Sequence, residues 1–130
     1  MKIYLDTMIL IYIVEDVETY SEKFSSRYNL KENAFVTSEL TRLECRVKPI
    51  KQNALELLQD FDLYFEESLQ EIIPISREVI DLATHIRANF GFKTPDSIHL
   101  ASAKINQCDI FLTFDDRLKN YKDIKVEMLE

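Results

Sequence analysis

The sequence contains no tryptophan, one glycine, three prolines, two cysteines and two histidines. So little glycine and proline excludes collagen-like segments, flexible linkers and proline-rich ligand segments. The two cysteines, Cys45 and Cys108, form no CxxC pair, and no cluster of cysteine and histidine suggests a zinc site. We therefore expect two reduced, buried thiols in a cytoplasmic protein rather than a disulfide framework.

Basic residues and long apolar runs are also scarce. The chain has 16 Lys and Arg against 23 Asp and Glu, which gives a net charge of −7 at pH 7. This balance excludes binding of nucleic acid through a broad basic surface, so such binding needs a local basic rim or a metal ion. The apolar run at 8–14 near the N-terminus is far shorter than the ~20 residues of a membrane span. We expect neither a signal peptide nor a membrane span.

What the sequence does contain indicates one globular domain over residues 1–130. Hydrophobic residues make up 46% of the chain and charged residues 30%, a balance that supports a buried core. Short apolar segments alternate with longer segments of helical period. Strands are expected at 2–6, 34–37, 71–75, 109–113 and 124–129, and helices at 7–14, 19–30, 38–47, 49–65, 76–89 and 94–107. This alternation predicts an α/β fold with three layers, α/β/α, around a central parallel β-sheet.

Two further expectations concern the sheet edge and the core. Pro74 lacks a backbone N–H, so the strand at 71–75 is expected near an edge of the sheet. The six tyrosines and eight phenylalanines follow strand or helix spacing. We interpret them as core residues rather than as a platform for nucleobases.

Four acidic residues fall where such a fold brings side chains together, outside the carboxyl ends of the strands. Asp6 ends the first strand, and Asp115 follows the apolar part of the strand at 109–113. Asp96 lies at the start of a helix, where a carboxylate is stabilised by free N–H groups and the helix dipole. The fourth acid, Glu44, lies within a helix.

Glu44 is the least expected of these acids. The buried face of its helix is predicted to consist of Leu40, Leu43 and Val47. Glu44 lies on this same face, where a charge is costly unless it is paired or bound to a metal. Alternatively, Glu44 reaches the rim of the protein and pairs with Lys48 at i+4.

Each aspartate also has an ordinary structural interpretation. Asp6 suits a helix cap, Asp96 a partner of the helix dipole, and Asp115 and Asp116 a turn after a strand. Taken together, however, clustered carboxylates repel each other and raise each other's pKa. A divalent cation relieves this repulsion, and oxygen ligands of this kind suit Mg²⁺ or Mn²⁺.

The acids occur in four segments, in the order Ile3–Thr7 (IYLDT), Ser38–Glu44 (SELTRLE), Asp96–Ala101 (DSIHLA) and Phe111–Asp115 (FLTFD). Together these segments resemble the motifs of the PIN-domain family, and in particular of VapC-type toxins from type II toxin–antitoxin pairs. The resemblance extends over essentially the whole chain. Two positions depart from the family pattern. Met8 replaces a small polar or β-branched residue, and Asp116 adds an acid beside the fourth motif.

The resemblance implies a PIN-like fold and a metal-dependent endoribonuclease, which hydrolyses RNA phosphodiester bonds with water activated by Mg²⁺ or Mn²⁺. The acids expected to bind the metal and carry catalysis are Asp6, Glu44, Asp96 and Asp115. Ser38, Thr113 and Asp116 are expected next to them, with the two hydroxyls donating hydrogen bonds to the carboxylates. We expect His99 to be a packed helix residue rather than a general base.

The resemblance also implies partners. These are an RNA substrate, a cognate VapB-type antitoxin and a second copy of the chain in a homodimer. The segment 9–14 supports the homodimer, because a helix of that composition is apolar almost all round.

Two other functions remain possible from the sequence. A Mg²⁺-binding receiver-like signalling domain would need an aspartate that ends a central strand and a later lysine, and the segments 72–76 and 112–113 provide neither. An inactive PIN-like binding scaffold would not need all four acids.

Overall fold

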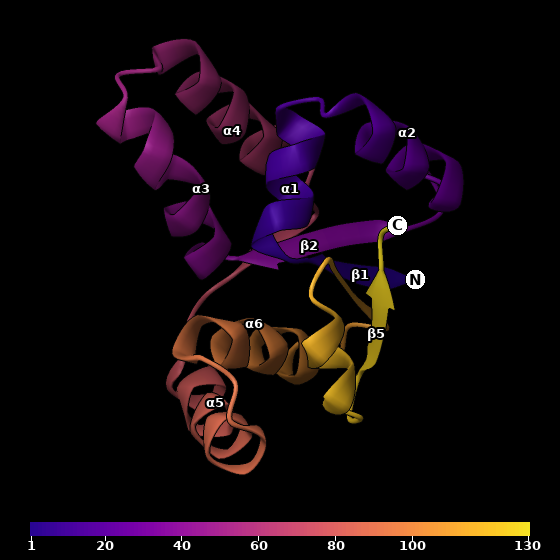
Figure 1. The fold of residues 1–130 in the computed structure, drawn as a ribbon, viewed down its shortest axis with the longest axis vertical. Coiled ribbons are helices and arrows are strands. Elements are labelled where there is room, and N and C mark those ends of the chain that lie inside the picture. The colour runs from indigo at the N-terminus through magenta and orange to yellow at the C-terminus, as the bar shows by residue number, and fades with distance from the viewer.

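The computed structural model describes residues 1–130 with every side chain except that of Glu18. Its centre is a sheet of five parallel strands in the order β3-β2-β1-β4-β5 (Figure 1). The strands are β1 (Lys2–Leu5), β2 (Ala34–Ser38), β3 (Glu71–Ile73), β4 (Ile110–Thr113) and β5 (Lys125–Met128). The predicted central parallel sheet is confirmed, and β3, which precedes Pro74, lies at the expected edge.

Helices cover both faces of this sheet. They are α1 (Thr7–Val14), α2 (Glu18–Arg27), α3 (Glu39–Lys51), α4 (Leu55–Glu67), α5 (Arg77–Phe90) and α6 (Thr94–Ile105), with a 3₁₀ helix η1 (Asp116–Asn120) before β5. Figure 1 shows α1 to α4 on one side of the sheet and α5 with α6 on the other, so the three-layer α/β/α prediction is confirmed. Among the residues described, no helix combines the length and the apolar character needed to cross a membrane.

The predicted helix boundaries are wrong at the end of α2, which stops at Arg27 rather than at residue 30, and around Pro49. The sequence suggested a new helix from Pro49, but α3 continues through Pro49 to Lys51 and the break falls at 52–54. Pro49 lies in the last turn of α3, where its missing N–H removes only one helical hydrogen bond. The chain turns at Asn53, which adopts the left-handed backbone conformation with φ 53°. Asparagine tolerates this conformation better than most residues.

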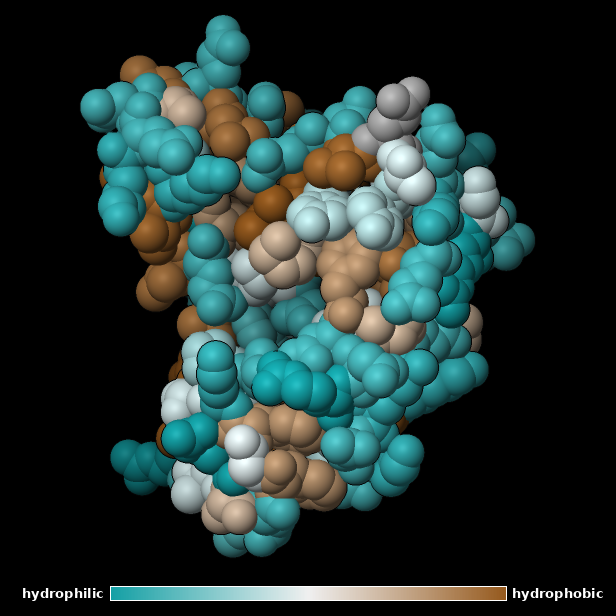
Figure 2. Space-filling model, in the orientation of Figure 1, coloured by the Kyte–Doolittle hydropathy of each residue, from teal (hydrophilic) through white to brown (hydrophobic). Residues whose placement is uncertain are grey.

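The buried face of α3 also differs from the prediction. Thr41, Cys45 and Pro49 are buried on it, whereas Leu43 and Val47 are 58% and 48% exposed. Apolar side chains therefore gather along the outside of α3, as the space-filling view shows (Figure 2). The exposed apolar residues of α3 and of the start of α4 are Leu43, Val47, Ile50 and Leu55, and we call this group the α3–α4 apolar surface. By contrast, the apolar residues 9–14 of α1 are buried or partly buried within the chain itself.

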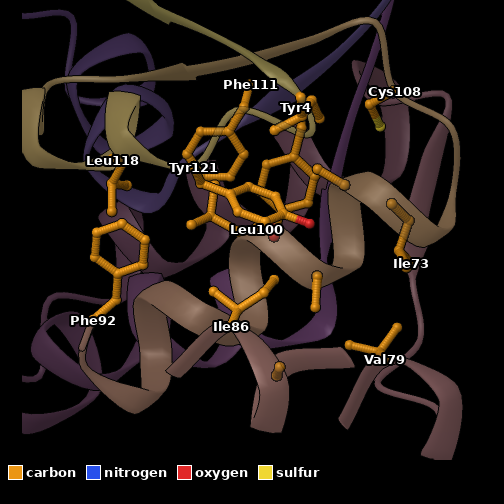
Figure 3. Close-up of a cluster of buried hydrophobic side chains, with 14 of the residues drawn as sticks. Tyr4, Ile73, Val79, Ile86, Phe92, Leu100, Cys108, Phe111, Leu118 and Tyr121 are labelled. Atoms are coloured by element: carbon orange, nitrogen blue, oxygen red, sulfur yellow. The ribbon is translucent and has the colours of Figure 1, made fainter. Parts of the chain in front are cut away.

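Side-chain alternation along β1 divides the core in two. Successive residues of a strand point to opposite faces of the sheet. Tyr4 points towards α5 and α6, where it stacks on Phe111 with ring centroids 5.2 Å apart and packs in one cluster with Leu100 (Figure 3). Ile3 and Leu5 point the other way, into the cluster beneath α1 and α2. The end of β1 is thus held between two cores, which fixes the position of the residue that follows it.

Candidate functional site

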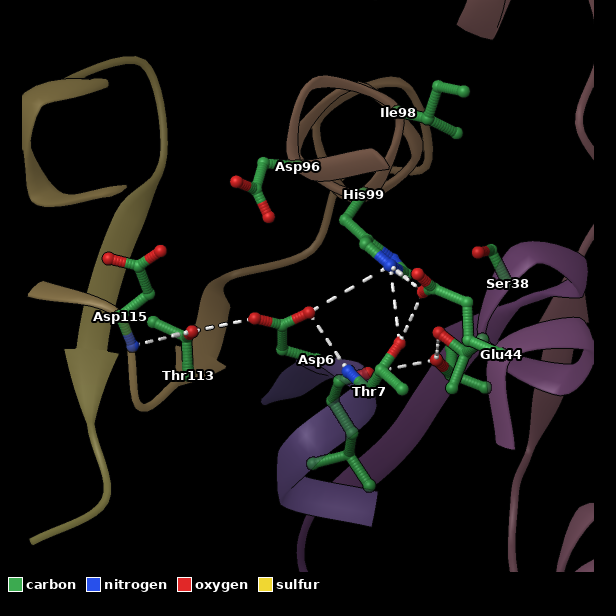
Figure 4. A network of polar contacts seen from close by, with 12 residues as sticks. Asp6, Thr7, Ser38, Glu44, Asp96, Ile98, His99, Thr113 and Asp115 are labelled. Carbon is green, nitrogen blue, oxygen red and sulfur yellow. Dashed lines mark hydrogen bonds and ion pairs between the residues drawn. The ribbon is translucent and has the colours of Figure 1, made fainter. Parts of the chain in front are cut away.

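A pocket of about 460 Å³ opens at the carboxyl ends of β1 and β4. All four predicted acids line it, namely Asp6, Glu44, Asp96 and Asp115 (Figure 4). They come from four separate places in the chain: the end of β1, the middle of α3, the first turn of α6 and the residue that precedes η1. The fold therefore gathers acids that are up to 109 positions apart in the sequence.

Asp6 is held by hydrogen bonds that follow from the register of the sheet. Leu5 of β1 pairs with Leu112 of β4, so the next residues, Asp6 and Thr113, also lie side by side. The Thr113 hydroxyl donates to Asp6 Oδ2 at 2.7 Å, and the Thr7 amide donates to Asp6 Oδ1 at 2.9 Å. Asp6 is thus both the N-cap of α1 and a wall of the pocket. The expected hydrogen bond from Thr113 is present.

Glu44 is held by a buried polar chain. Its Oε1 accepts a hydrogen bond from the Thr7 hydroxyl at 2.7 Å and lies 2.7 Å from His99 Nε2. Because a carboxylate only accepts, Nε2 is the donor. Burial raises the pKa of Glu44, but the hydrogen bonds from His99 and Thr7 outweigh it and leave this pKa below its usual value. The structure thus holds Glu44 ionised towards the pocket, and the alternative pairing with Lys48 is absent from the described ion pairs.

His99 connects Glu44 to the core. The His99 ring is 2% exposed, and its Nδ1 lies 2.7 Å from the Tyr4 hydroxyl. The Tyr4 hydroxyl in turn lies 2.8 Å from Ser38 Oγ. His99 is therefore packed, as expected, but it also positions a pocket carboxylate, which the sequence analysis missed. The available signal was its place three residues after Asp96, on the same side of α6.

Ser38 does not donate a hydrogen bond to the carboxylates, contrary to the expectation, whereas Asp116 lies beside the pocket as expected. Ser38 follows Val36 by two residues, so it faces the same core as Tyr4 and bonds to the Tyr4 hydroxyl instead. The side chain of Asp116 borders the pocket but is 82% exposed, and its ion pair is with Lys119 at 3.5 Å. Of the two neighbouring acids after β4, Asp115 is the one whose carboxylate shares the Arg117 guanidinium with Asp96.

The other side of the pocket carries negative charge that the protein neutralises only in part. Asp96 accepts no hydrogen bond from the described residues, and its nearest cation is the Arg117 guanidinium at 3.6 Å. Burial and then the charges of Asp6 and Asp115 raise the pKa of Asp96. Hydrogen bonds from the same guanidinium hold the pKa of Asp115 below its usual value. Arg117 is itself 62% exposed, so it offsets this negative charge only from the rim.

The residues fit a divalent cation in their chemistry. Among the described side chains, no three His, Cys, Asp or Glu are arranged to hold a metal ion as they stand. The donors are nevertheless of the right kind, since Asp6, Asp96 and Asp115 present hard oxygen atoms to one pocket. Burial and the charges of Asp6 and Asp115 raise the pKa of Asp96, and a cation bound among these carboxylates would neutralise their negative charge.

The sequence matches a known family model, and the fold is similar to those of several solved structures. A family model described as PIN domain matches residues 3–124. No curated protein has a matching sequence. Similar solved structures include VapBC2 from Rickettsia felis bound to a promoter DNA fragment, with TM-score 0.83, 18% identity and full coverage of both chains. DNA-bound VapBC from Salmonella typhimurium has TM-score 0.80 and 16% identity over 100% of this chain and 99% of that one. A toxin–antitoxin complex from Klebsiella pneumoniae has TM-score 0.73 and 20% identity over 93% of each chain.

Proposed function

Because the chain belongs to the PIN-domain family, we propose that it is a metal-dependent endoribonuclease that hydrolyses RNA phosphodiester bonds. The observation that carries this proposal is the convergence of Asp6, Glu44, Asp96 and Asp115 on one pocket. Four acids in one place are costly to a fold unless they bind a cation. A cation bound there would offset the negative charge of a phosphodiester substrate.

The four acids have different proposed roles. Asp6, Asp96 and Asp115 would hold Mg²⁺ or Mn²⁺. When bound, such an ion offsets the charge of the phosphate and makes a nearby water more acidic. Glu44, which His99 and Thr7 hold in place through Oε1, would orient the attacking water or bind a second ion. Thr113 orients Asp6 and is not itself in contact with substrate in this scheme.

We further propose that the protein is the toxin of a cytoplasmic toxin–antitoxin pair, with a VapB-type antitoxin as its partner. The similar solved structures are described as VapBC or toxin–antitoxin complexes. Two features of this chain suit such an inhibitor. The acidic pocket would accept an arginine or lysine, and the α3–α4 apolar surface would be covered by apolar residues of the same segment. We also propose a homodimer, for which α1 offers only the exposed Met8 and the partly buried residues 11–14.

Cleavage of structured RNA by the purified chain tests the nuclease directly. We expect cleavage with Mg²⁺ or Mn²⁺, no cleavage with EDTA, and products with 5′-phosphate and 3′-hydroxyl ends. RNA that carries 2′-deoxyribose at the cleaved position should still be cut, because water rather than the 2′-hydroxyl is the nucleophile. The matched control is Asp81→Asn, an exposed acid of α5 outside the pocket, which should retain full activity. Cleavage that EDTA leaves unchanged would contradict the metal-dependent mechanism.

Expression in cells tests the toxin. We expect the chain alone to stop growth, and co-expression with the small protein encoded beside it to restore growth. The Asp96→Asn variant should be harmless at the same level of expression. If the unmodified chain cleaves RNA in vitro but is harmless in cells, the toxin assignment is wrong and a housekeeping nuclease is the better interpretation. If it neither cleaves RNA nor affects growth, the inactive-scaffold interpretation holds.

A further inference from the structure

Three aromatic rings meet beside the acidic pocket. Tyr12 of α1, Tyr20 of α2 and Phe114 after β4 have mutual centroid distances of 5.1, 5.0 and 4.9 Å. All three side chains are only partly buried, unlike the fully buried Tyr4 or Phe111. Tyr20 and Phe114 pack against the core beneath α1 and α2, as expected of aromatic residues, but all three rings also retain solvent-accessible surface. We call this group the aromatic triad.

The aromatic triad is continuous with the pocket. Phe114 lies between Thr113 and Asp115 in sequence and is itself part of the pocket wall. Met8, which is 45% exposed, also lines the pocket and precedes Tyr12 by one turn on the same side of α1. Figure 2 shows this face of the molecule, where a hollow below α1 and α2 is bordered by apolar and weakly polar side chains next to strongly polar ones. A ligand whose phosphate sits among the acids can therefore reach the rings.

The aromatic triad also has free polar groups. Neither the Tyr12 nor the Tyr20 hydroxyl takes part in a hydrogen bond among the described residues. Lys23 Nζ lies 5.4 Å from the centroid of the Tyr20 ring and belongs to none of the described ion pairs. Partly accessible rings beside an amine are surroundings in which a nucleobase can stack and a neighbouring phosphate can be neutralised.

The charge of the protein gives such stacking a particular importance. The net charge of −7 opposes binding of RNA through general electrostatic attraction. Affinity must then come from local contacts, among them contacts that do not depend on charge. Stacking of bases on aromatic side chains is such a contact, and it tolerates any base because every base has a π face.

We propose that Tyr12, Tyr20 and Phe114 form a stacking site for one unpaired nucleobase of the RNA substrate, next to the phosphate that is cleaved. This inference rests on the proposed function for the identity of the ligand. A base can stack there only when it is free of its own helix, so the site selects cleavage positions in loops and single strands. Lys23 lies where it can pair with a phosphate of the same strand.

Binding is tested with a tryptophan reporter, since the chain has no tryptophan of its own. The protein is Tyr20→Trp in an Asp96→Asn background, which prevents cleavage, and the control is Phe90→Trp on α5, behind the opposite face of the sheet. We expect saturable quenching of the residue-20 reporter by a single-stranded RNA, and none by an abasic strand of the same length or by duplex RNA. The control reporter should not respond. If RNA binds without quenching, or if only the antitoxin quenches, the proposal is wrong.

Kinetics with the unmodified pocket provide the second test. Tyr20→Leu should raise KM for RNA about tenfold with little change in kcat, whereas Tyr20→Phe should resemble the parent. A scan of abasic positions around the cleaved bond should reveal one position that gives the same loss, and the two losses should not add. Additive losses at every abasic position would refute stacking on this ring. Quenching in a protein whose parent never cleaves RNA would refute the proposed nuclease but not the stacking site.

Discussion

The two sides of the acidic pocket are built in different ways. On one side, which we call the supported side, Asp6 and Glu44 accept hydrogen bonds from side chains and amides that the fold places beside them. On the other, the unsupported side, Asp96 accepts no hydrogen bond from the described residues. Asp115 is bonded mainly to the exposed Arg117. The first pair of acids is organised by the protein itself, and the second still lacks part of its counter-charge.

The two sides of the pocket therefore contribute differently to the stability of the fold and to the proposed binding of a cation. Acids that donors already satisfy add to the stability of the fold, while acids that only repel each other reduce it. The unsupported side is therefore where a cation would contribute most, because its binding removes a repulsion that the protein does not relieve. The supported side would provide a rigid frame against which that cation is held.

Isosteric substitution of one acid on each side gives the largest expected effect. Both Asp6→Asn and Asp96→Asn should reduce RNA cleavage at least about 100-fold, because each removes a charged oxygen from the proposed metal site. Their effects on stability should be opposite. Asp6→Asn should cost about 1–2 kcal/mol in the free energy of unfolding, because one amide oxygen cannot accept from both Thr7 and Thr113. Asp96→Asn should keep or raise stability in metal-free buffer.

The pH dependence of the free energy of unfolding provides a further test of this difference between the two sides. The pKa of Asp96 is raised in the folded protein, so its charge opposes folding at neutral pH and is neutralised as pH falls through that raised value. The stability gained in Asp96→Asn should therefore be present at pH 7 and disappear in acid, where the parent carboxyl is already protonated. Denaturant unfolding of both proteins across this pH range measures the difference. A gain that persists unchanged below pH 3 would show that the gain does not come from charge.

The buried chain behind the supported side should be the most sensitive structural element. His99→Leu removes the partner of both Glu44 and the buried Tyr4 hydroxyl, and we expect a loss of about 3 kcal/mol. His85→Leu, on the exposed part of α5, should leave stability nearly unchanged. Thermal and denaturant unfolding compare the two. Equal losses in the two variants would mean that His99 has no special partner role.

Metal binding should act mainly through the unsupported side. Mg²⁺ at 100 times its Kd should stabilise the parent by about 2.7 kcal/mol, since it binds the folded chain only. The shift should be much smaller in Asp96→Asn, while Asp81→Asn on α5 should respond like the parent. Melting curves over a Mg²⁺ titration measure this. A full response in Asp96→Asn would place the cation elsewhere.

The supported side also shows what could be predicted from the sequence. Asp6 directly follows the short apolar strand β1 and Thr113 ends β4, and the parallel pairing of these strands brings the two residues together. Pro74 likewise indicated the sheet edge. The wrong predictions concern which way a side chain faces. Ser38 lies on the face of β2 that meets Tyr4, and Thr37 on the opposite face bonds to Thr41, so neither hydroxyl reaches a carboxylate.

Helix faces were harder to predict than strand ends for a related reason. Apolar character suggested that Leu43 and Val47 were buried, but α3 packs through Thr41 and Cys45 because Thr41 has a buried partner in Thr37. Such a pairing depends on tertiary contacts, which periodicity does not encode. The same holds for the aromatic triad. Its three rings come from α1, from α2 and from the segment after β4, and only the tertiary fold brings them into contact.

The smallest expected effect concerns Arg117, which stands beside the unsupported side as the protein's own cation. Its guanidinium bonds to Asp115 and lies 3.6 Å from Asp96, so it competes with an added cation for the same oxygens. Arg117→Gln should leave the melting temperature almost unchanged without metal, because the side chain is exposed. It should lower the Mg²⁺ concentration for half-maximal stabilisation a few-fold. Lys119→Gln, which loses only the partner of Asp116, is the matched control. If Arg117→Gln leaves this Mg²⁺ concentration unchanged but weakens RNA binding, then Arg117 faces the substrate rather than the metal, and the difference between the two sides lies in Asp96 alone.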